Sequence, residues 1–200
     1  TYTMKDGYTI VPLHFTSHDA LFVLFEENTD LLSADYPHHE AHLQQQLYGP
    51  WTLHFQQERG APQTAVFDTL QSYTLSAEMG IRYFSGTATY CKSFDLDRHF
   101  NPSQPCWLDL GQVKNLARVR LNGEDLGILW KTPFRVEVSG QLRKEGNVLE
   151  IEVTNLWPNR MIGDLQPGVK KKITYASYPF FTADSPLLES GILGPVQFIQ

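Results

Sequence analysis

The chain has 200 residues, of which 42% are hydrophobic and 19% are charged, and its formal net charge at pH 7 is −6. This composition is typical of a folded globular protein and excludes a largely disordered chain. The acidic balance excludes a surface that tracks nucleic-acid phosphates, and no apolar run reaches the length that spans a membrane. The basic triplet at residues 170–172 is interpreted as part of a solvated loop.

Residues 1–47 differ in pattern from the rest of the chain. The apolar run DALFVLFEE at residues 19–27 predicts a strand, and PHHEAHLQQQL at residues 37–47 predicts a short helix. We therefore expect residues 1–47 to form an N-terminal strand arm and a helical linker that follow a preceding module.

Residues 48–200 carry strand patterns. Apolar and polar residues alternate in WTLHF (51–55), FRVEV (134–138) and VLEIEVT (148–154), which is the period of half-buried antiparallel strands. The pair Asn122-Gly123 predicts a tight hairpin, because both central positions of that turn need a positive φ. The predicted fold is all-β, a jelly-roll β-sandwich that forms one domain over residues 48–200.

The two cysteines, Cys91 and Cys106, lack the spacing of a metal site. They fall in neighbouring predicted strands, so one disulfide in an oxidising compartment is one interpretation. Two unpaired, half-buried thiols are the other, because cysteine behaves as a small hydrophobe.

Patterns of catalytic residues are weak in this chain. A sugar hydrolase needs two carboxylates that face one bond. No spacing pairs the acidic residues in or near predicted loops, which are Asp109, Glu124, Asp125, Asp164 and Glu189. Acidic residues are common in β-turns, so we interpret these as structural. No G-x-S-x-G elbow is present and no glycine-rich loop opens a helix, so we predict no catalytic residue and no nucleotide cofactor.

Three histidines, His38, His39 and His42, lie in the string HHEAH, which does not meet the zinc-protease pattern H-E-x-x-H. We interpret them as solvated and predict no transition-metal site. A structural calcium stays open, because loop carboxylates and backbone carbonyls leave little sequence signature.

The order of motifs over residues 48–200 resembles a known family. RYFSGTATYCKSF (82–94) is followed by LDLGQVKNLARVRLNGEDLGILWKTPFRVEV (108–138), GNVLEIEVTNLWPNRMIGD (146–164) and SGILGPVQF (190–198). This core is similar to the galactose-binding-like, family 2 type sugar-binding domains of glycoside hydrolases. The strings SGTATY, NLWPNRMIGD and SGILGPV resemble the C-terminal region of α-L-rhamnosidases of glycoside hydrolase family 106.

The resemblance implies that the catalytic carboxylates lie in a separate barrel, which needs about 250 residues and alternating strands and helices. The chain is then a non-catalytic accessory domain of a polysaccharide-degrading, α-L-rhamnosidase-like enzyme. Its implied partners are a plant or microbial polysaccharide or oligosaccharide and the catalytic domain of the same parent chain, with no nucleic acid and no membrane. The implied location is periplasmic or secreted, the chain being a fragment without a signal peptide.

Three interpretations compete for TNLWPNRMIGD at residues 154–164. In the first, Trp157, Asn159 and Arg160 contact a sugar together with Trp130, because aromatic faces and polar donors suit sugar rings. In the second, Trp157 fills the core and Arg160 forms a buried strut with Asp164. In the third, the segment docks on the catalytic domain.

The stretch at residues 171–191 is a long connection with little alternation and several aromatic residues. Loops of this length in a compact domain are usually functional or interface elements. The alternative to sugar binding is therefore a purely structural interdomain module with no sugar affinity.

Overall fold

The computed structural model describes residues 1–200 apart from 14, 27, 36–41 and 102–103. Two compact units make up the chain, Thr1–Ala41 and His42–Gln200. The sequence places the division after residue 47, whereas the structure assigns the strand at Leu43–Gln46 to the second unit.

The first unit contains a small antiparallel sheet with the strand order β2-β1-β3. Its strands are β1 (Tyr2–Lys5), β2 (Tyr8–Ile10) and β3 (Ser33–Ala34). The strand predicted at residues 19–27 is wrong over its described part, because residues 19–26 have no strand structure. Phe22 and Phe25 are 89% and 78% exposed there, and residues 19–26 pair with no described strand, whereas a strand forms only where its backbone groups are paired.

The second unit is built on a six-stranded antiparallel sheet in the order β11-β10-β13-β7-β5-β6. Its members in chain order are β5 (Trp51–Phe55), β6 (Thr64–Phe67), β7 (Thr87–Phe94), β10 (Leu116–Leu121), β11 (Glu124–Leu129) and β13 (Asn147–Thr154). Asn122 and Gly123 join β10 to β11 with φ of 55° and 90°, as their hairpin pattern predicts.

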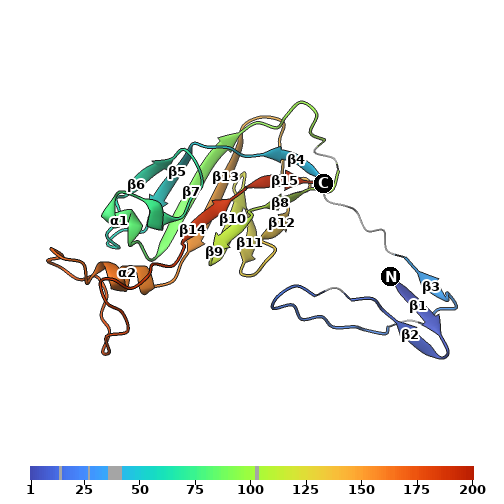
Figure 1. The fold of residues 1–200 in the computed structure, drawn as a ribbon. Coiled ribbons are helices and arrows are strands. Elements are labelled where there is room, and N and C mark those ends of the chain that lie inside the picture. Colours follow the sequence, from blue (N-terminus) through green and yellow to red (C-terminus); the bar gives the residue numbers. More distant parts are fainter. Residues whose placement is uncertain (14, 27, 36–41, 102–103) are drawn as a thin grey trace. The chain divides into compact units, whose positions relative to one another are not determined.

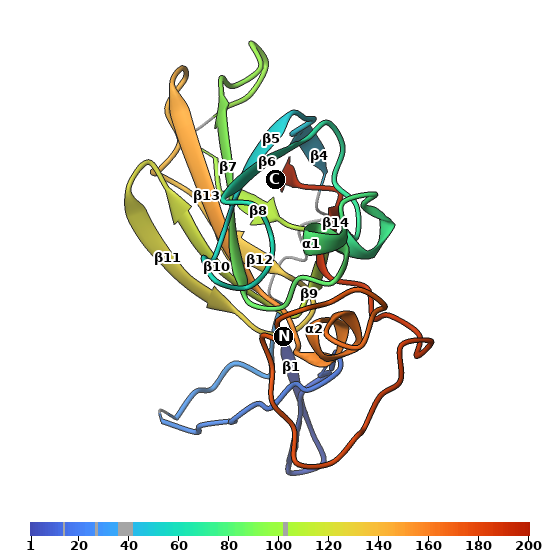
Figure 2. The same ribbon diagram turned by 90° about the vertical axis from the view of Figure 1, so that its left-hand side faces the viewer.

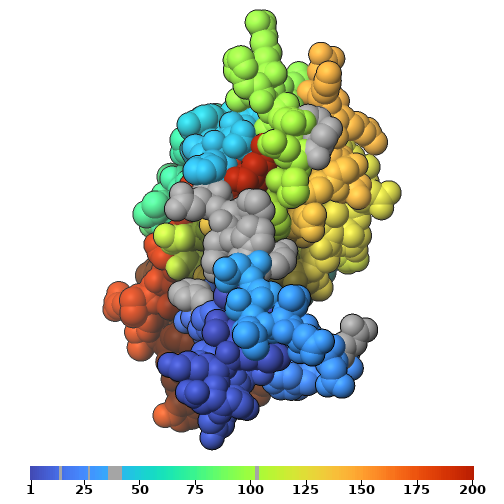
Figure 3. All heavy atoms as spheres, turned by 90° about the vertical axis from the view of Figure 1, so that its right-hand side faces the viewer, coloured from blue at the N-terminus to red at the C-terminus, as the bar shows by residue number. Residues whose placement is uncertain are grey.

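A four-stranded sheet in the order β12-β8-β15-β4 forms a second layer (Figures 1 and 2). It consists of β4 (Leu43–Gln46), β8 (Trp107–Asp109), β12 (Arg135–Glu137) and β15 (Gln197–Ile199). In Figure 3 the red C-terminal residues lie between cyan and green segments, in keeping with the place of β15 between β4 and β8. Two further strands, β9 (Gln112–Lys114) and β14 (Gly191–Gly194), pair with each other.

Both layers contribute to one hydrophobic core. Leu53 and Ile151 from the six-stranded sheet and Leu108 and Phe198 from the four-stranded sheet are fully buried in it. The alternation along β13 is the cause, because every second side chain of a strand points to the same face. The strands predicted at residues 51–55, 134–138 and 148–154 are therefore confirmed as β5, β12 and β13.

The helix predicted at residues 37–47 is wrong where it is described. Residues 37–41, with His38 and His39, lie outside the described residues, and Leu43–Gln46 forms β4. β4 pairs with β15, and the backbones of His42 and Gln200 exchange hydrogen bonds of 2.7 and 3.0 Å. The available edge of β15 decides the local structure, since tertiary pairing overrides local propensity.

Short helices cluster at one end of the sandwich (Figure 1). They are the 3-10 turn η1 (Tyr73–Leu75), α1 (Met79–Arg82) and α2 (Pro158–Gly163). β14 crosses nearby, and a Cβ at Gly191 would stand 2.5 Å from the hydroxyl oxygen of Tyr90. Only glycine fits at this approach, where Gly191 has a φ of 92° and the Ile192 N–H donates to that hydroxyl at 3.1 Å.

Candidate functional site

The segment that follows β13 forms the helix α2 and not an irregular loop. Asn155 is buried at its start, where its side chain accepts from the Gly86 N–H at 2.8 Å and donates to the Phe84 carbonyl at 2.9 Å. Pro158 then occupies the first turn of α2, where its missing N–H costs nothing and its fixed φ suits the helix. The helix begins where it does because the Asn155 contacts anchor the chain to the turn before β7.

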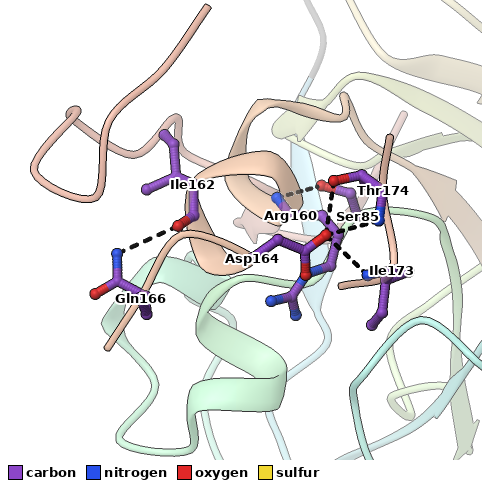
Figure 4. Close-up of polar contacts among 7 residues, drawn as sticks. All are labelled: Ser85, Arg160, Ile162, Asp164, Gln166, Ile173 and Thr174. Carbon is purple, nitrogen blue, oxygen red and sulfur yellow. Dashed lines mark hydrogen bonds and ion pairs between the residues drawn. The ribbon is translucent and has the colours of Figure 1, made fainter. Parts of the chain in front are cut away.

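Arg160 and Asp164 form a buried ion pair one helical turn apart. Arg160 Nε lies 3.1 Å from Asp164 Oδ1, and the two side chains are 8% and 3% exposed. The other carboxylate oxygen accepts from the Ile173 N–H at 2.9 Å and from the N–H and hydroxyl of Thr174 at 2.6 Å each (Figure 4). A buried carboxylate is tolerated because its lone pairs are satisfied in this way.

Asn159 ties the other end of the same loop to α2. Its side-chain amide donates to the Leu188 carbonyl at 2.7 Å and accepts from the Leu188 N–H at 2.8 Å. Gln166 adds a bond of 2.8 Å to the Ala183 carbonyl. The connection from α2 to β14, residues 164–190, is therefore held at both of its ends; we call it the aromatic loop.

The residues proposed for sugar contact differ in their exposure. Asn159 and Arg160 are 2% and 7% exposed and bond to the fold, whereas Trp130 and Trp157 are 62% and 45% exposed. Trp130 follows β11, and Trp157 precedes α2, where the Arg59 guanidinium carbon lies 4.9 Å from the centre of its ring. Trp157 is thus a surface aromatic under a cation, which differs from the core plug of the second interpretation.

Three adjoining hollows run along α2 and the aromatic loop. The first, about 680 Å³, ends at Ile173 and is lined by charged and amide side chains. The second, about 330 Å³, is lined by Trp157, Met161, Ile173, Thr174 and Tyr175. The third has the same volume and shares Met161, Thr174 and Tyr175 with the second. It continues to the aromatic side chains of Tyr178, Phe180 and Phe181.

Three residues contribute to this region without any signal in the sequence patterns: Ser85, Thr174 and Arg59. Ser85 accepts from the Arg160 N–H at 3.1 Å, Thr174 bonds Asp164, and Arg59 covers Trp157. These partners are 10 to 98 residues apart in the chain, as in the pairs Thr174 with Asp164 and Arg59 with Trp157. Periodicity reports only neighbours within one element, so it carries no signal for them.

Cationic side chains contact three more of the loop carboxylates, Asp109, Asp125 and Glu189. Asp109 pairs with Arg135 at 2.8 Å, and Glu189 pairs with Lys114 at 3.1 Å. Asp125 pairs with Arg118, in the same hairpin of the six-stranded sheet. Each contact joins strands or loops of the fold, so the geometry favours a structural role for these carboxylates.

The two cysteines are free thiols, and the disulfide interpretation is wrong. Cys91 lies on β7 in the six-stranded sheet, whereas Cys106 directly precedes β8 in the four-stranded sheet. Burial raises the pKa of the Cys106 thiol to about 11. Burial, and then the charge of Glu150, raise the pKa of Cys91. Both thiols are therefore protonated near neutral pH.

Within the described residues, no three His, Cys, Asp or Glu side chains are grouped so that they could hold a metal ion. None of the helices found there has the length and apolar character needed to cross a membrane.

Comparison with known proteins decides the family. Residues 71–176 match the glycosyl hydrolase 2 galactose-binding domain-like family. The chain belongs to this family. That membership and the antiparallel sheets confirm the predicted all-β, galactose-binding-like sandwich. The matched residues begin before η1 and end within the aromatic loop, so the galactose-binding-like domain includes α2 and its buried ion pair.

The chain spans less than a third of the length of each of three relatives. The chain is 36% identical over 175 residues to a putative beta-glucuronidase of Formosa agariphila, a match that covers 76% of the chain and 15% of that protein. A rhamnosidase structure from Novosphingobium sp. PP1Y shares 39% identity and a TM-score of 0.91 over 99% of the chain and 19% of the rhamnosidase. A β-D-glucuronidase from Dictyoglomus thermophilum, at 21% identity and a TM-score of 0.55, covers 82% of the chain and 29% of that protein, and shows the fold alone.

Proposed function

We propose that this galactose-binding-like domain is a non-catalytic accessory part of an α-L-rhamnosidase-like glycoside hydrolase of the family 106 type, in the C-terminal region of the parent. Its principal role is to hold the catalytic module of the parent protein in place through the aromatic loop. The observation that carries this proposal is the exposure of large aromatic side chains on a loop that buried polar contacts hold in place.

The parent activity is inferred from the relatives. The rhamnosidase similarity extends over 99% of the chain at 39% identity, and the chain spans 19% of that protein, which leaves room for a catalytic module elsewhere. The Formosa agariphila relative favours β-glucuronidase as a second candidate activity. Hydrolysis of an aryl α-L-rhamnoside and an aryl β-D-glucuronide by the full-length parent distinguishes the two, and activity on the glucuronide alone would overturn the first.

The docking role follows from the exposed aromatic side chains. Tyr175, Tyr178 and Phe180 are 91%, 65% and 67% exposed. The rings of Tyr178 and Phe180 pack edge to face with centroids 5.3 Å apart. Aromatic side chains that are exposed and preordered are typical anchors of interfaces, since they bury much apolar area at little cost in conformational entropy.

The docking test uses the full-length parent with Tyr178→Ser and Phe180→Ser together. We expect the accessory and catalytic modules to unfold in one calorimetric transition in the parent and in two in this variant, because the loop no longer couples them. The control is Tyr48→Ser, which changes a side chain of similar exposure, 71%, before β5. Retained coupling in the double variant would contradict the docking role.

We also propose that the parent is periplasmic or secreted and acts on plant or microbial polysaccharide, because such polymers are too large to cross a membrane intact. Fractionation of the native host tests this location, and recovery of the parent with cytoplasmic markers would contradict it.

The alternative is a purely structural interdomain module with no sugar affinity. Titration with saccharides separates it from a sugar-binding role, because a purely structural module binds none of them.

A further inference from the structure

A basic hollow lies along residues 171–173 of the aromatic loop, next to the hollow that Trp157 lines. Its volume is about 680 Å³, and its lining comprises Gln56, Gln57, Glu58, Arg59, Gly60, Lys171, Lys172 and Ile173. Three of these side chains are cationic and one is anionic, although the chain as a whole carries a net charge of −6. A local excess of positive charge in a concave surface attracts an anionic group.

The guanidinium of Arg160 lies behind Gly60 in the wall of the hollow, and the Asp164 carboxylate balances its charge. A Cβ at Gly60 would stand 2.9 Å from Arg160 Nη1 and 3.0 Å from the Ile173 side chain, so glycine allows the close approach. The bond from Arg160 to Asp164 uses Nε, and its other guanidinium nitrogens have no hydrogen-bond acceptor in the part of the chain that the structure describes. Nη1 of Arg160 thus lies behind Gly60 with unused donor capacity.

An aromatic surface adjoins the basic hollow. The neighbouring hollow, lined by Trp157 and Tyr175 among others, shares Ile173 with it. Arg59 belongs to the lining of the basic hollow and also lies over the Trp157 ring at 4.9 Å. Cationic and aromatic surfaces are therefore continuous along one groove.

We infer that this groove binds an acidic saccharide. The apolar C–H face of a sugar ring packs against Trp157, and its carboxylate or sulfate group enters the basic hollow between Arg59, Lys171 and Lys172. The anion site stands on the geometry of this chain alone, whereas the assignment of a saccharide rests on the proposed function. An extended polyanion such as nucleic acid suits the surface poorly, because the remaining surface is acidic.

Calorimetric titration of the 200-residue chain tests the inference without catalysis or docking. The probes are trigalacturonic acid, its methyl ester as a neutral match, and a sulfated disaccharide. We expect saturable binding of an acidic probe and binding of the ester weaker by about tenfold, because the ester lacks the charge. Binding of the acid should weaken with added salt. The stronger of the two acidic probes distinguishes a carboxylate from a sulfate.

Matched variants locate the site. The double variant Lys171→Ala, Lys172→Ala should weaken binding of the acidic probe by about tenfold, whereas Lys5→Ala, Lys144→Ala removes two exposed lysines elsewhere and should leave it unchanged. Trp157→Ala should weaken binding of both the acid and its ester. Equal binding of acid and ester, equal loss in both lysine variants, or no binding of any probe would each overturn the inference. None of these readouts depends on the module coupling that tests the docking role.

Discussion

The sandwich core and the α2 region are both well buried, but different forces hold them together. The core joins Leu53, Ile151 and Phe198 by apolar contact, which is non-directional and proportional to buried area. The α2 region depends on a few directed bonds, chiefly those of Asp164 to Arg160, Ile173 and Thr174. The difference implies that the core tolerates small changes of shape, whereas the α2 region fails when one polar atom is lost.

The same contrast separates stability from function. The sandwich places β13 and β14, and the buried polar contacts of α2 then hold an exposed loop in one arrangement. Hydrophobic burial contributes little to the order of this loop, since its aromatic side chains Tyr175, Tyr178 and Phe180 are exposed. Hydrogen bonds at its two ends order the aromatic loop and leave its aromatic side chains exposed.

Asp164→Ala should give the largest effect. It leaves the Arg160 charge buried without its partner and removes the acceptor of Ile173 and Thr174, so we expect the unfolding free energy to fall by about 4 kcal/mol. Chemical denaturation measures the loss, and limited proteolysis should show cleavage within residues 165–190. The control is Asp125→Ala, which breaks a solvent-exposed pair, and a loss no greater than in this control would remove the contrast between the two regions.

Ile151→Val sharpens the comparison from the side of the core. It removes one methyl group from a fully buried position of β13, and we expect a loss of about 1 kcal/mol. The midpoint of denaturation should shift while its slope stays constant. Proteolysis of the aromatic loop should not increase, and an increase like that of Asp164→Ala would mean that the two regions are not held independently.

The thiols report how tightly the sandwich excludes solvent. Burial raises the pKa of Cys106 to about 11 and also raises that of Cys91, so little thiolate is present at pH 8. We expect slow reaction of the folded chain with a chromogenic disulfide, with Cys106 slower than Cys91 because it is fully buried. The denatured chain should react rapidly at both positions. Rapid reaction of Cys106 in the native chain would show that the core opens.

Asp125 should show the smallest effect on stability. Its hydrogen bond from Arg118, and then that from the Gly127 N–H, lower its pKa to about 2. Because this pKa is lower in the folded chain than in the unfolded chain, ionised Asp125 stabilises the fold at pH values above its usual pKa. The contribution fades as the pH falls toward 2. Solvent screens this exposed pair, so the change in stability is small. An NMR titration should find the low pKa, and Arg118→Gln should raise it; an unchanged value would exclude the ion pair as its cause.

Several elements of the fold could be predicted from the sequence. The alternation in β5, β12 and β13 and the Asn122-Gly123 turn are local signals, and the structure confirms them. The apolar run at residues 19–26 and the helix-like Leu43–Gln46 mislead, because strand formation there depends on whether an edge is available. β4 finds the edge of β15, and the described residues 19–26 find none.

The candidate site follows the same division. The sequence alone determines that Trp157, Arg160 and Asp164 lie close together, because they share one short segment. Only the tertiary structure decides that Asp164 holds Thr174, that Arg59 covers Trp157, and that Lys171 lines a hollow with Gln56. The physical reason is the range of the interactions: hydrophobic periodicity is set within one element, whereas charged and hydrogen-bonded partners are chosen by which loops the folded sheets bring together.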